Sequence, residues 1–414
     1  MGSRAACDGN ARLKMVDMLI DDTPQLIAWR QEVRGFLDAE LPGGMHFDFD
    51  FDEDPDRWAL YRAFWRKVGE RKWISLTWPT EYYGLGRSVQ ERYILQEEFC
   101  NHGVPAHPVI GLPVADAILR LGTPEQRRRH LKGIAEASVV WGEGYTEPGA
   151  GSDLASLTTR ADRDGDYWVI NGEKTLGTAA HWCEWMFVLA RTDPNSKKHA
   201  GISAFAVPLN LPGISMAPLR NMADGQQNVT FFDNVRIPAD GLIGDKGQAW
   251  NQVWFSQGGE QLDPPGPAPD PWLYRLQRMV ALIRRFVRET RRGGRLLWDD
   301  PVVRLQLAEL EMGVEILRMH TRENYSNVVT GHMRSGSPIL VAHLQQAWYK
   351  EQWPRMAQLA MEVVGPMSQL QGGPGAVLHG KIEQAFRASF GNHAGGTSQL
   401  KRMVLATRGL GMPR

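Results

Sequence analysis

The ten residues from 144 to 153, Gly-Tyr-Thr-Glu-Pro-Gly-Ala-Gly-Ser-Asp, combine an adaptable backbone with hydroxyl side chains. Their glycines let the backbone come close to a bound group. The hydroxyls of Tyr145, Thr146 and Ser152 can bind phosphate, carbonyl or heterocycle oxygens. This composition suits a ligand-binding loop, but it is also typical of an exposed turn, so composition alone leaves both interpretations open.

Residues 145–153, Tyr-Thr-Glu-Pro-Gly-Ala-Gly-Ser-Asp, resemble the signature of the acyl-CoA dehydrogenase family. Members of this family are flavoenzymes that desaturate acyl-CoA thioesters between the α and β carbons. Nine consecutive positions make the resemblance specific. It implies FAD as cofactor, an acyl-CoA as substrate, and an electron-transferring flavoprotein or a similar protein as electron acceptor.

The implied reaction needs a carboxylate base that removes the α-proton. In many members the base is a glutamate near the C-terminus, but the matching position here is Gly395, in the Ala-Gly-Gly-Thr string at 394–397. A minority places the base in a Glu-Arg pair in the helix after the β domain, and Glu260 matches that position. We therefore expect Glu260 to be the base. Gln261 replaces the usual arginine, and the alternative is a solvated glutamate at a helix end.

The resemblance also implies roles for residues around the flavin. It assigns Tyr145 and Thr146 to the edge of the isoalloxazine ring, and Ser152 to the thioester arm. Thr178 matches a hydroxyl residue near the ring nitrogen that accepts hydride, although Thr178 can also be read as an ordinary strand residue. Leu176 stands where the family usually has a tryptophan.

The C-terminal part contains a second set of implied cofactor contacts. The segment 369–375, which includes Gln369 and Gly373, resembles the dinucleotide-phosphate loop that reaches the flavin of a neighbouring subunit. Taken alone, its glycines and proline are more often a turn. Thr397 and Gln399 match the last family contacts to the cofactor. The resemblance therefore implies a homo-oligomer or a heteromer with a paralogous subunit.

The local patterns predict which elements position these residues. Helical spacing of apolar residues predicts N-terminal helices, and short apolar runs between turn residues predict strands. Asn171-Gly172 is the strongest hairpin signal, and Asp164-Gly165 marks another turn. Helical spacing returns beyond Gly247. The helices are expected over 24–37, 58–65, 89–99, 114–121, 124–134, 273–287, 303–327, 339–364 and 399–408, and the strands over 167–170, 186–190, 201–207, 215–219 and 229–235.

These elements predict a mainly helical α+β fold. We expect an N-terminal helical domain over residues 1–138, a small central β-barrel or sandwich over 139–245, and a C-terminal four-helix bundle over 246–414. The resemblance implies the same order of domains, and it extends over nearly the whole chain.

The composition excludes several classes of protein. The chain has 414 residues, 43% of them hydrophobic, and its 47 basic and 47 acidic residues cancel, so neither nucleic acid nor an anionic membrane is an expected partner. Three scattered cysteines and isolated histidines predict no metal site and suit a reducing compartment. We see neither a membrane-spanning run nor a secretory signal, and expect a cytoplasmic protein.

Three functions remain in competition. The first is an FAD-dependent acyl-CoA dehydrogenase for a branched, cyclic or bulky acyl group, because glycines occupy positions 395 and 396. The second is a flavoenzyme of the same fold with altered chemistry, such as a desulfinase or monooxygenase, which Leu176 and the missing C-terminal glutamate would suit. The third is a non-catalytic subunit that completes the site of a paralogous partner.

Overall fold

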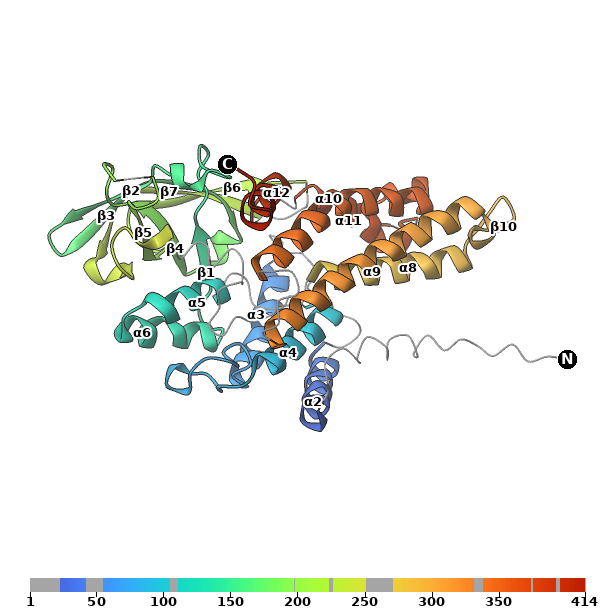
Figure 1. Cartoon of the computed structure of the whole chain (residues 1–414), viewed down its shortest axis with the longest axis horizontal. Helices are drawn as coiled ribbons and strands as arrows, with labels where there is room; N and C mark the ends of the chain where they lie inside the picture. Colours follow the sequence, from blue (N-terminus) through green and yellow to red (C-terminus); the bar gives the residue numbers. More distant parts are fainter. Residues whose placement is uncertain are drawn as a thin grey trace.

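The computed structural model describes residues 23–41, 55–104, 111–196, 198–222, 226–250, 271–330, 338–373, 375–391 and 395–413. Within these residues, helices occupy both ends of the chain and strands occupy the middle (Figure 1). This arrangement confirms the predicted fold class: a mainly helical protein with a central β region and a set of C-terminal helices.

The N-terminal helices begin where the sequence supplies helix caps. The Thr23 hydroxyl accepts a hydrogen bond from Leu26 N at 3.4 Å, and Ser88 and Thr123 each form a reciprocal capping box with the residue three positions later. Aromatic side chains such as Trp65 and Phe99 pack between these helices. The helices are α2 (Pro24–Glu40), α3 (Pro55–Glu70), α4 (Val89–Asn101), α5 (Gly111–Leu121) and α6 (Pro124–Ala135).

The central region is a single sheet of eight strands in the order β6-β7-β3-β2-β4-β5-β8, with β1 pairing in parallel to β4. Strand β4 is buried on both faces, because α5 and α6 cover one side and the rest of the sheet packs on the other. The strands are β1 (Trp141–Gly144), β2 (Arg160–Asp164), β3 (Tyr167–Thr178), β4 (Trp185–Arg191), β5 (Ile202–Pro208), β6 (Ile214–Arg220), β7 (Gln226–Pro238) and β8 (Leu242–Ile243).

The expected hairpin at Asn171-Gly172 is wrong. The chain reverses at Gly165, which has a φ of 55°, and β2 pairs with β3 from Asp164↔Tyr167 onward. Asn171-Gly172 lies inside β3, at a shift in the register with β7. Gly172 is needed there because its φ is 144° and a Cβ atom would lie 2.7 Å from Thr159 Cα. The glycine therefore serves a bulge and a close backbone approach, not a turn.

The C-terminal helices form an elongated bundle that extends away from the sheet (Figure 1). A short hairpin of β9 (Arg291–Arg292) and β10 (Arg295–Leu296) lies at its far end, while α12 lies beside the sheet. The nine-residue helix α11 was not predicted, because it is too short to show a sustained period. The helices are α8 (Pro271–Glu289), α9 (Pro301–Thr330), α10 (Pro338–Val364), α11 (Lys381–Ser389) and α12 (Ser398–Val404).

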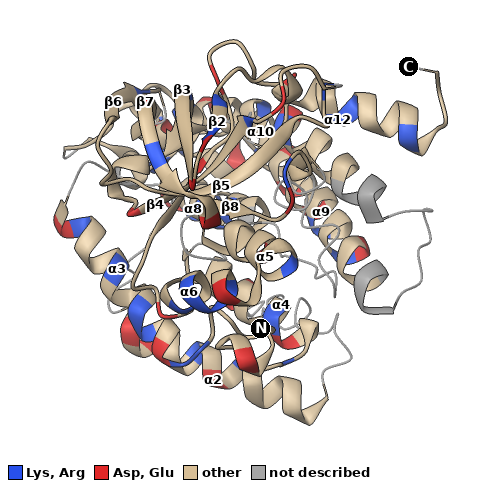
Figure 2. Ribbon diagram, turned by 90° about the vertical axis from the view of Figure 1, so that its left-hand side faces the viewer, with Lys and Arg blue, Asp and Glu red and all other residues tan. Residues whose placement is uncertain are grey.

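Acidic and basic residues are interspersed along α2, α3 and α6 (Figure 2). Their mixture agrees with the formal net charge of zero. A search of the described helices for a segment with the length and apolar character of a membrane span finds none.

Candidate active site

The loop at 145–153 is fixed by a buried carboxylate. Glu147 accepts hydrogen bonds from Thr158 N at 2.6 Å, Thr158 Oγ1 at 2.8 Å and Thr159 N at 2.9 Å. It also forms an ion pair of 2.8 Å with Lys174 Nζ, and both side chains are at least 96% buried. Lys174 faces inward because it continues the alternation of Trp168 and Ile170 along β3. The loop is therefore tied to β3 through the core.

Burial and the charge of the partner shift the pKa values of Glu147 and Lys174 in opposite directions. Burial alone would raise the pKa of Glu147, but the Lys174 ammonium and the hydrogen bonds lower it to about 2. Burial lowers the pKa of Lys174 to about 8, against the attraction of the carboxylate. Glu147 is consequently ionised at neutral pH and available as a fixed acceptor.

The anchored loop places Tyr145 and Thr146 beside β3. The Tyr145 carbonyl oxygen accepts from Lys174 Nζ at 3.1 Å, and its buried ring packs edge-on against Phe187. The Thr146 carbonyl oxygen accepts from Thr175 N at 2.8 Å. Thr178, the last residue of β3, is half-buried three positions further along. Tyr145, Thr146 and Thr178 thus come from neighbouring segments, whereas Ser152 is exposed at the outer part of the loop.

Leu176 supplies an apolar surface next to Thr178. Its side chain is 48% exposed and its φ is 59°, an uncommon conformation for a residue with a side chain. The register of β3 with β7 shifts between Lys174 and Gly177, so β3 is irregular at this position. Leu176 thus offers an exposed apolar side chain next to Thr175, which contacts the Thr146 backbone, and two residues before Thr178. Such a surface suits a flat heterocycle that has polar edges. These residues therefore fit the flavin that the resemblance implies.

The cofactor contacts expected in the C-terminal part of the chain fall into two groups. Gln369 ends the 3₁₀ helix η8 (Pro366–Gln369) and Gly373 follows it; both are exposed. They lie just beyond α10, whose Val364 carbonyl accepts from Arg292 Nη2 in the hairpin at the far end of the bundle. Gln369 and Gly373 are consequently distant from Tyr145 within one chain.

Thr397 and Gln399 lie at the other end of the bundle, on α12 beside the sheet. The Thr397 hydroxyl accepts from Leu400 N at 3.2 Å and caps the helix, while Gln399 is exposed. The preceding helix α11 reaches the sheet domain, because Arg387 Nη1 donates to the Met222 carbonyl at 2.8 Å. Glu260 lies outside the described residues, so its surroundings are not part of this geometry.

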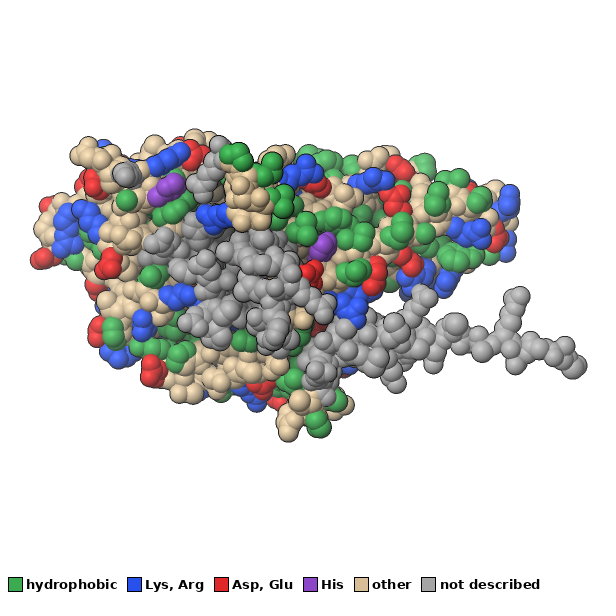
Figure 3. Space-filling model, in the orientation of Figure 1, with side chains coloured by type: hydrophobic (Ala, Val, Ile, Leu, Met, Phe, Trp, Pro, Cys, Tyr) green, Lys and Arg blue, Asp and Glu red, His purple; other side chains and the backbone are tan. Residues whose placement is uncertain are grey.

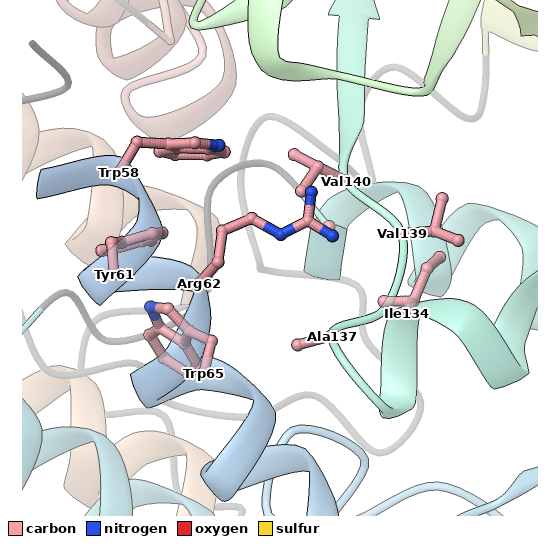
Figure 4. A pocket seen from close by; sticks show the side chains of 9 residues that line it. Trp58, Tyr61, Arg62, Trp65, Ile134, Ala137, Val139 and Val140 are labelled. Atoms are coloured by element: carbon pink, nitrogen blue, oxygen red, sulfur yellow. The ribbon is translucent and has the colours of Figure 1, made fainter. Parts of the chain in front are cut away.

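Two hollows in the described part of the chain are lined by other side chains than these candidate residues. The smaller one holds about 30 Å³, room for roughly one water, between Trp58, Tyr61 and Trp65 of α3 and the segment before β1 (Figure 4). The Arg62 guanidinium at its edge is held by Glu184 and the Ser138 carbonyl. The larger hollow, of about 520 Å³, has the size of a ligand site. It begins at Ala180, two residues beyond Thr178, and is bounded by Trp185, Met216 and neighbouring residues.

Sequence reasoning missed two charged residues that shape the site. The alternation of buried residues along β3 could have identified Lys174 as a buried cation that needs a carboxylate partner. That partner, Glu147, is the glutamate of the loop at 145–153. It also missed Glu143 on β1, two residues before Tyr145. Burial raises the pKa of Glu143 to about 8, so its carboxyl holds a proton more tightly than the carboxyl of an exposed glutamate does.

The chain has a helical domain, a small sheet domain and a helical bundle in this order, which is the fold of a known class of flavoenzymes. Comparisons of the chain with known proteins agree with that class. Three family models match: the acyl-CoA dehydrogenase N-terminal domain over residues 23–138, the middle domain over 142–235, and the C-terminal domain over 272–410. The chain therefore belongs to the acyl-CoA dehydrogenase family.

Individual relatives are similar over nearly their full length. Acyl-CoA dehydrogenase FadE26 of Mycobacterium tuberculosis is 34% identical over 407 residues, covering 96% of this chain and 99% of the relative. The solved ChsE4–ChsE5 complex of Mycobacterium tuberculosis contains a chain of 31% identity with a TM-score of 0.82, which covers 95% of this chain and 99% of that chain. The Tcur3481–Tcur3483 steroid ACAD has 30% identity and a TM-score of 0.81, with 95% and 98% covered.

Proposed function

We propose that this chain catalyses the FAD-dependent α,β-dehydrogenation of an acyl-CoA thioester, with Glu260 as the base that removes the α-proton. The observation that carries this proposal is the loop at 145–153, held against β3 by the buried Glu147–Lys174 pair. This anchoring brings the Thr146 backbone against Thr175 of β3, next to the exposed Leu176. Family membership supports the reaction class.

Each residue has a defined part in the proposed reaction. Bound FAD would accept the hydride from the β-carbon of the thioester. Tyr145, Thr146 and Thr178 would hold the ring, and Ser152 would contact the thioester arm. Gly395 has no carboxylate at the position that supplies the base in many relatives, so the base has to come from another residue. Glu260 is the glutamate that the family pattern offers.

A bulky, polycyclic acyl group is the substrate class that we infer. One solved relative, at 30% identity, is described as a steroid ACAD. Gly395 and Gly396, which carry no side chain, are consistent with a wide substrate cleft; both have a positive φ, at 70° and 99°. We also propose that the protein is cytoplasmic and that an electron-transferring flavoprotein accepts its electrons.

We further infer that a complete site needs a second chain, and that this chain pairs with a paralogous subunit. Gln369 and Gly373 lie at the far end of the bundle from Tyr145, so both sets could meet one FAD only across an interface. Two solved relatives are complexes of two differently named chains. Hydrophobic side chains also gather on the surface of the bundle (Figure 3). On α9 they are exposed at helical spacing: Val302, Leu305, Met312, Ile316 and Met319.

The test is anaerobic reduction of the protein-bound flavin. We expect the protein, purified alone or with its co-expressed paralogue, to show a flavin spectrum that bleaches with a polycyclic acyl-CoA. Glu260→Gln should keep the flavin and lose the bleaching. Glu136→Gln, which changes an exposed glutamate at the end of α6, is the matched control and should bleach as the wild type does.

The outcomes separate the competing functions. Full bleaching activity in Glu260→Gln removes the base assignment. A yellow protein that no thioester bleaches favours altered chemistry, such as a desulfinase or monooxygenase. A chain that binds flavin only after co-expression supports a site shared with a paralogous subunit, and a homomeric protein that is fully active contradicts the pairing with a paralogue.

A further inference from the structure

Helix α9 has two apolar faces, whereas a surface helix needs only one to pack on its own domain. The first face is buried in the C-terminal bundle and includes Val303, Leu310 and Leu317. The second face is exposed. Its apolar side chains, which are between 40% and 71% exposed, are Val302, Leu305, Met312, Ile316 and Met319. An exposed apolar face of this size marks a contact with another molecule.

The spacing of the second face indicates what kind of element would cover it. Together with Glu309, its members recur after alternating steps of three and four residues, from Val302 to Met319. This heptad spacing is typical of the positions that pack against a second helix in a coiled coil. We call these six residues the α9 seam, which is about 26 Å long. The expected contact is therefore another α-helix that lies along α9.

The α9 seam is complementary to itself. Its steps of three and four residues read the same from both ends, and its midpoint lies between Leu310 and Glu311. A second α9 that runs antiparallel therefore places every seam residue opposite another seam residue. The facing pairs are Val302 with Met319, Leu305 with Ile316, and Glu309 with Met312.

Glu309 favours the antiparallel arrangement. Two α9 helices packed in parallel and in register would place Glu309 against Glu309 of the second copy, which is unfavourable because both are acidic. In the antiparallel arrangement Glu309 faces Met312 instead, and its carboxylate can keep its ion pair with Arg355 of α10 in the same chain. A single polar residue in an apolar seam fixes the register of paired helices in this way.

The glutamates beside the seam do not oppose self-association. Glu311 forms an ion pair of 2.7 Å with Arg284 of α8, and Glu315 forms an ion pair with Arg318. Two copies of this surface can therefore approach each other without bringing these carboxylates together unpaired.

The exposed area is sufficient for a specific contact. The five apolar side chains of the seam expose about 500 Å² per chain, so two copies would bury about 1,000 Å² through them alone. Specific interfaces begin at about 1,000–1,200 Å², and the residues that flank the seam add to the buried area.

We propose that the α9 seam is a two-fold contact, in which α9 packs antiparallel against α9 of a second copy of this chain. This inference does not rest on the proposed reaction. An assembly of two copies of this chain and two copies of a paralogue would contain this contact as well as a shared flavin site.

The first test counts the copies of this chain in each particle, by sedimentation of the full-length protein with its co-expressed paralogue if one is required. Leu305→Glu combined with Met312→Glu places carboxylates in the seam and should halve the number of copies. Leu60→Glu, which changes an exposed leucine of α3, is the matched control and should keep the number. A wild-type particle with a single copy of this chain, or an unchanged number in the double variant, would overturn the proposal. Loss of a paralogue from such a single-copy particle would assign the seam to the paralogue.

The second test uses cysteines, and it does not depend on a disruptive variant. Leu305→Cys combined with Ile316→Cys should give covalent dimers on mild oxidation, because each residue faces the other in the second copy. Val302→Cys combined with Met312→Cys is one heptad out of register, about 10 Å along the helix, and should give none. Covalent dimers from either single variant of the first pair would indicate parallel helices and contradict the proposal. Absence of dimers in the Leu305/Ile316 double variant would do the same.

Discussion

Replacing Lys174 by Met should strongly destabilise the protein, because it leaves Glu147 charged in the core. The pKa of Glu147 is lowered from 4.5 to about 2 in the folded chain. At about 1.4 kcal/mol per pKa unit, this shift corresponds to about 3 kcal/mol of stabilisation of the carboxylate. Removing one partner of a buried ion pair typically costs about 3–5 kcal/mol, which agrees with this figure. We expect Lys174→Met to lower the free energy of unfolding by about 3 kcal/mol.

Urea denaturation followed by tryptophan fluorescence measures this change. Lys198→Met is the matched control, because Lys198 pairs with Asp153 of the same loop in an exposed ion pair and should contribute little. A loss below about 1 kcal/mol in Lys174→Met, or equal losses in both variants, would refute the anchoring role of the buried pair.

The pH dependence of stability gives a second measure of the same pair. The folded-state pKa of Glu147 is lowered, so its stabilisation is fully present above the unfolded value near 4.5 and is lost as the pH falls towards 2. Lys174→Met removes the attraction that lowers this pKa. Its unfolding free energy should therefore fall less steeply than that of the wild type over this pH range.

Two further predictions concern other buried contacts, and both are measured by urea denaturation. Arg30→Met leaves Glu97 buried without a cation, while Glu98 keeps its ion pair with Arg34, and it should cost about 3–5 kcal/mol. This loss should be well above that in Arg34→Met, whose side chain is 41% exposed. Gly172→Ala places a Cβ atom 2.7 Å from Thr159 Cα and should cost about 1–3 kcal/mol. Gly149→Ala has nothing within 4 Å of the new atom; a cost equal to that of Gly172→Ala would contradict the steric argument.

The sequence alone determined the fold class, because its helices are long and have strong local signals. Thr23-Pro24 and Thr123-Pro124 mark helix starts, and apolar spacing fixes the buried faces of α8 and α9. The loop at 145–153 was also evident, because nine adjacent residues match one family pattern. Local signals of this kind need no knowledge of distant contacts.

Tertiary structure decided which of these segments contact one another. Both Asp164-Gly165 and Asn171-Gly172 suit a turn, and only the pairing of β3 with β7 makes the second one a bulge. Glu147 and Lys174 are 27 residues apart, so their pairing depends on how the loop packs against β3. Contacts between distant residues depend on the packing of whole elements, which no local pattern records.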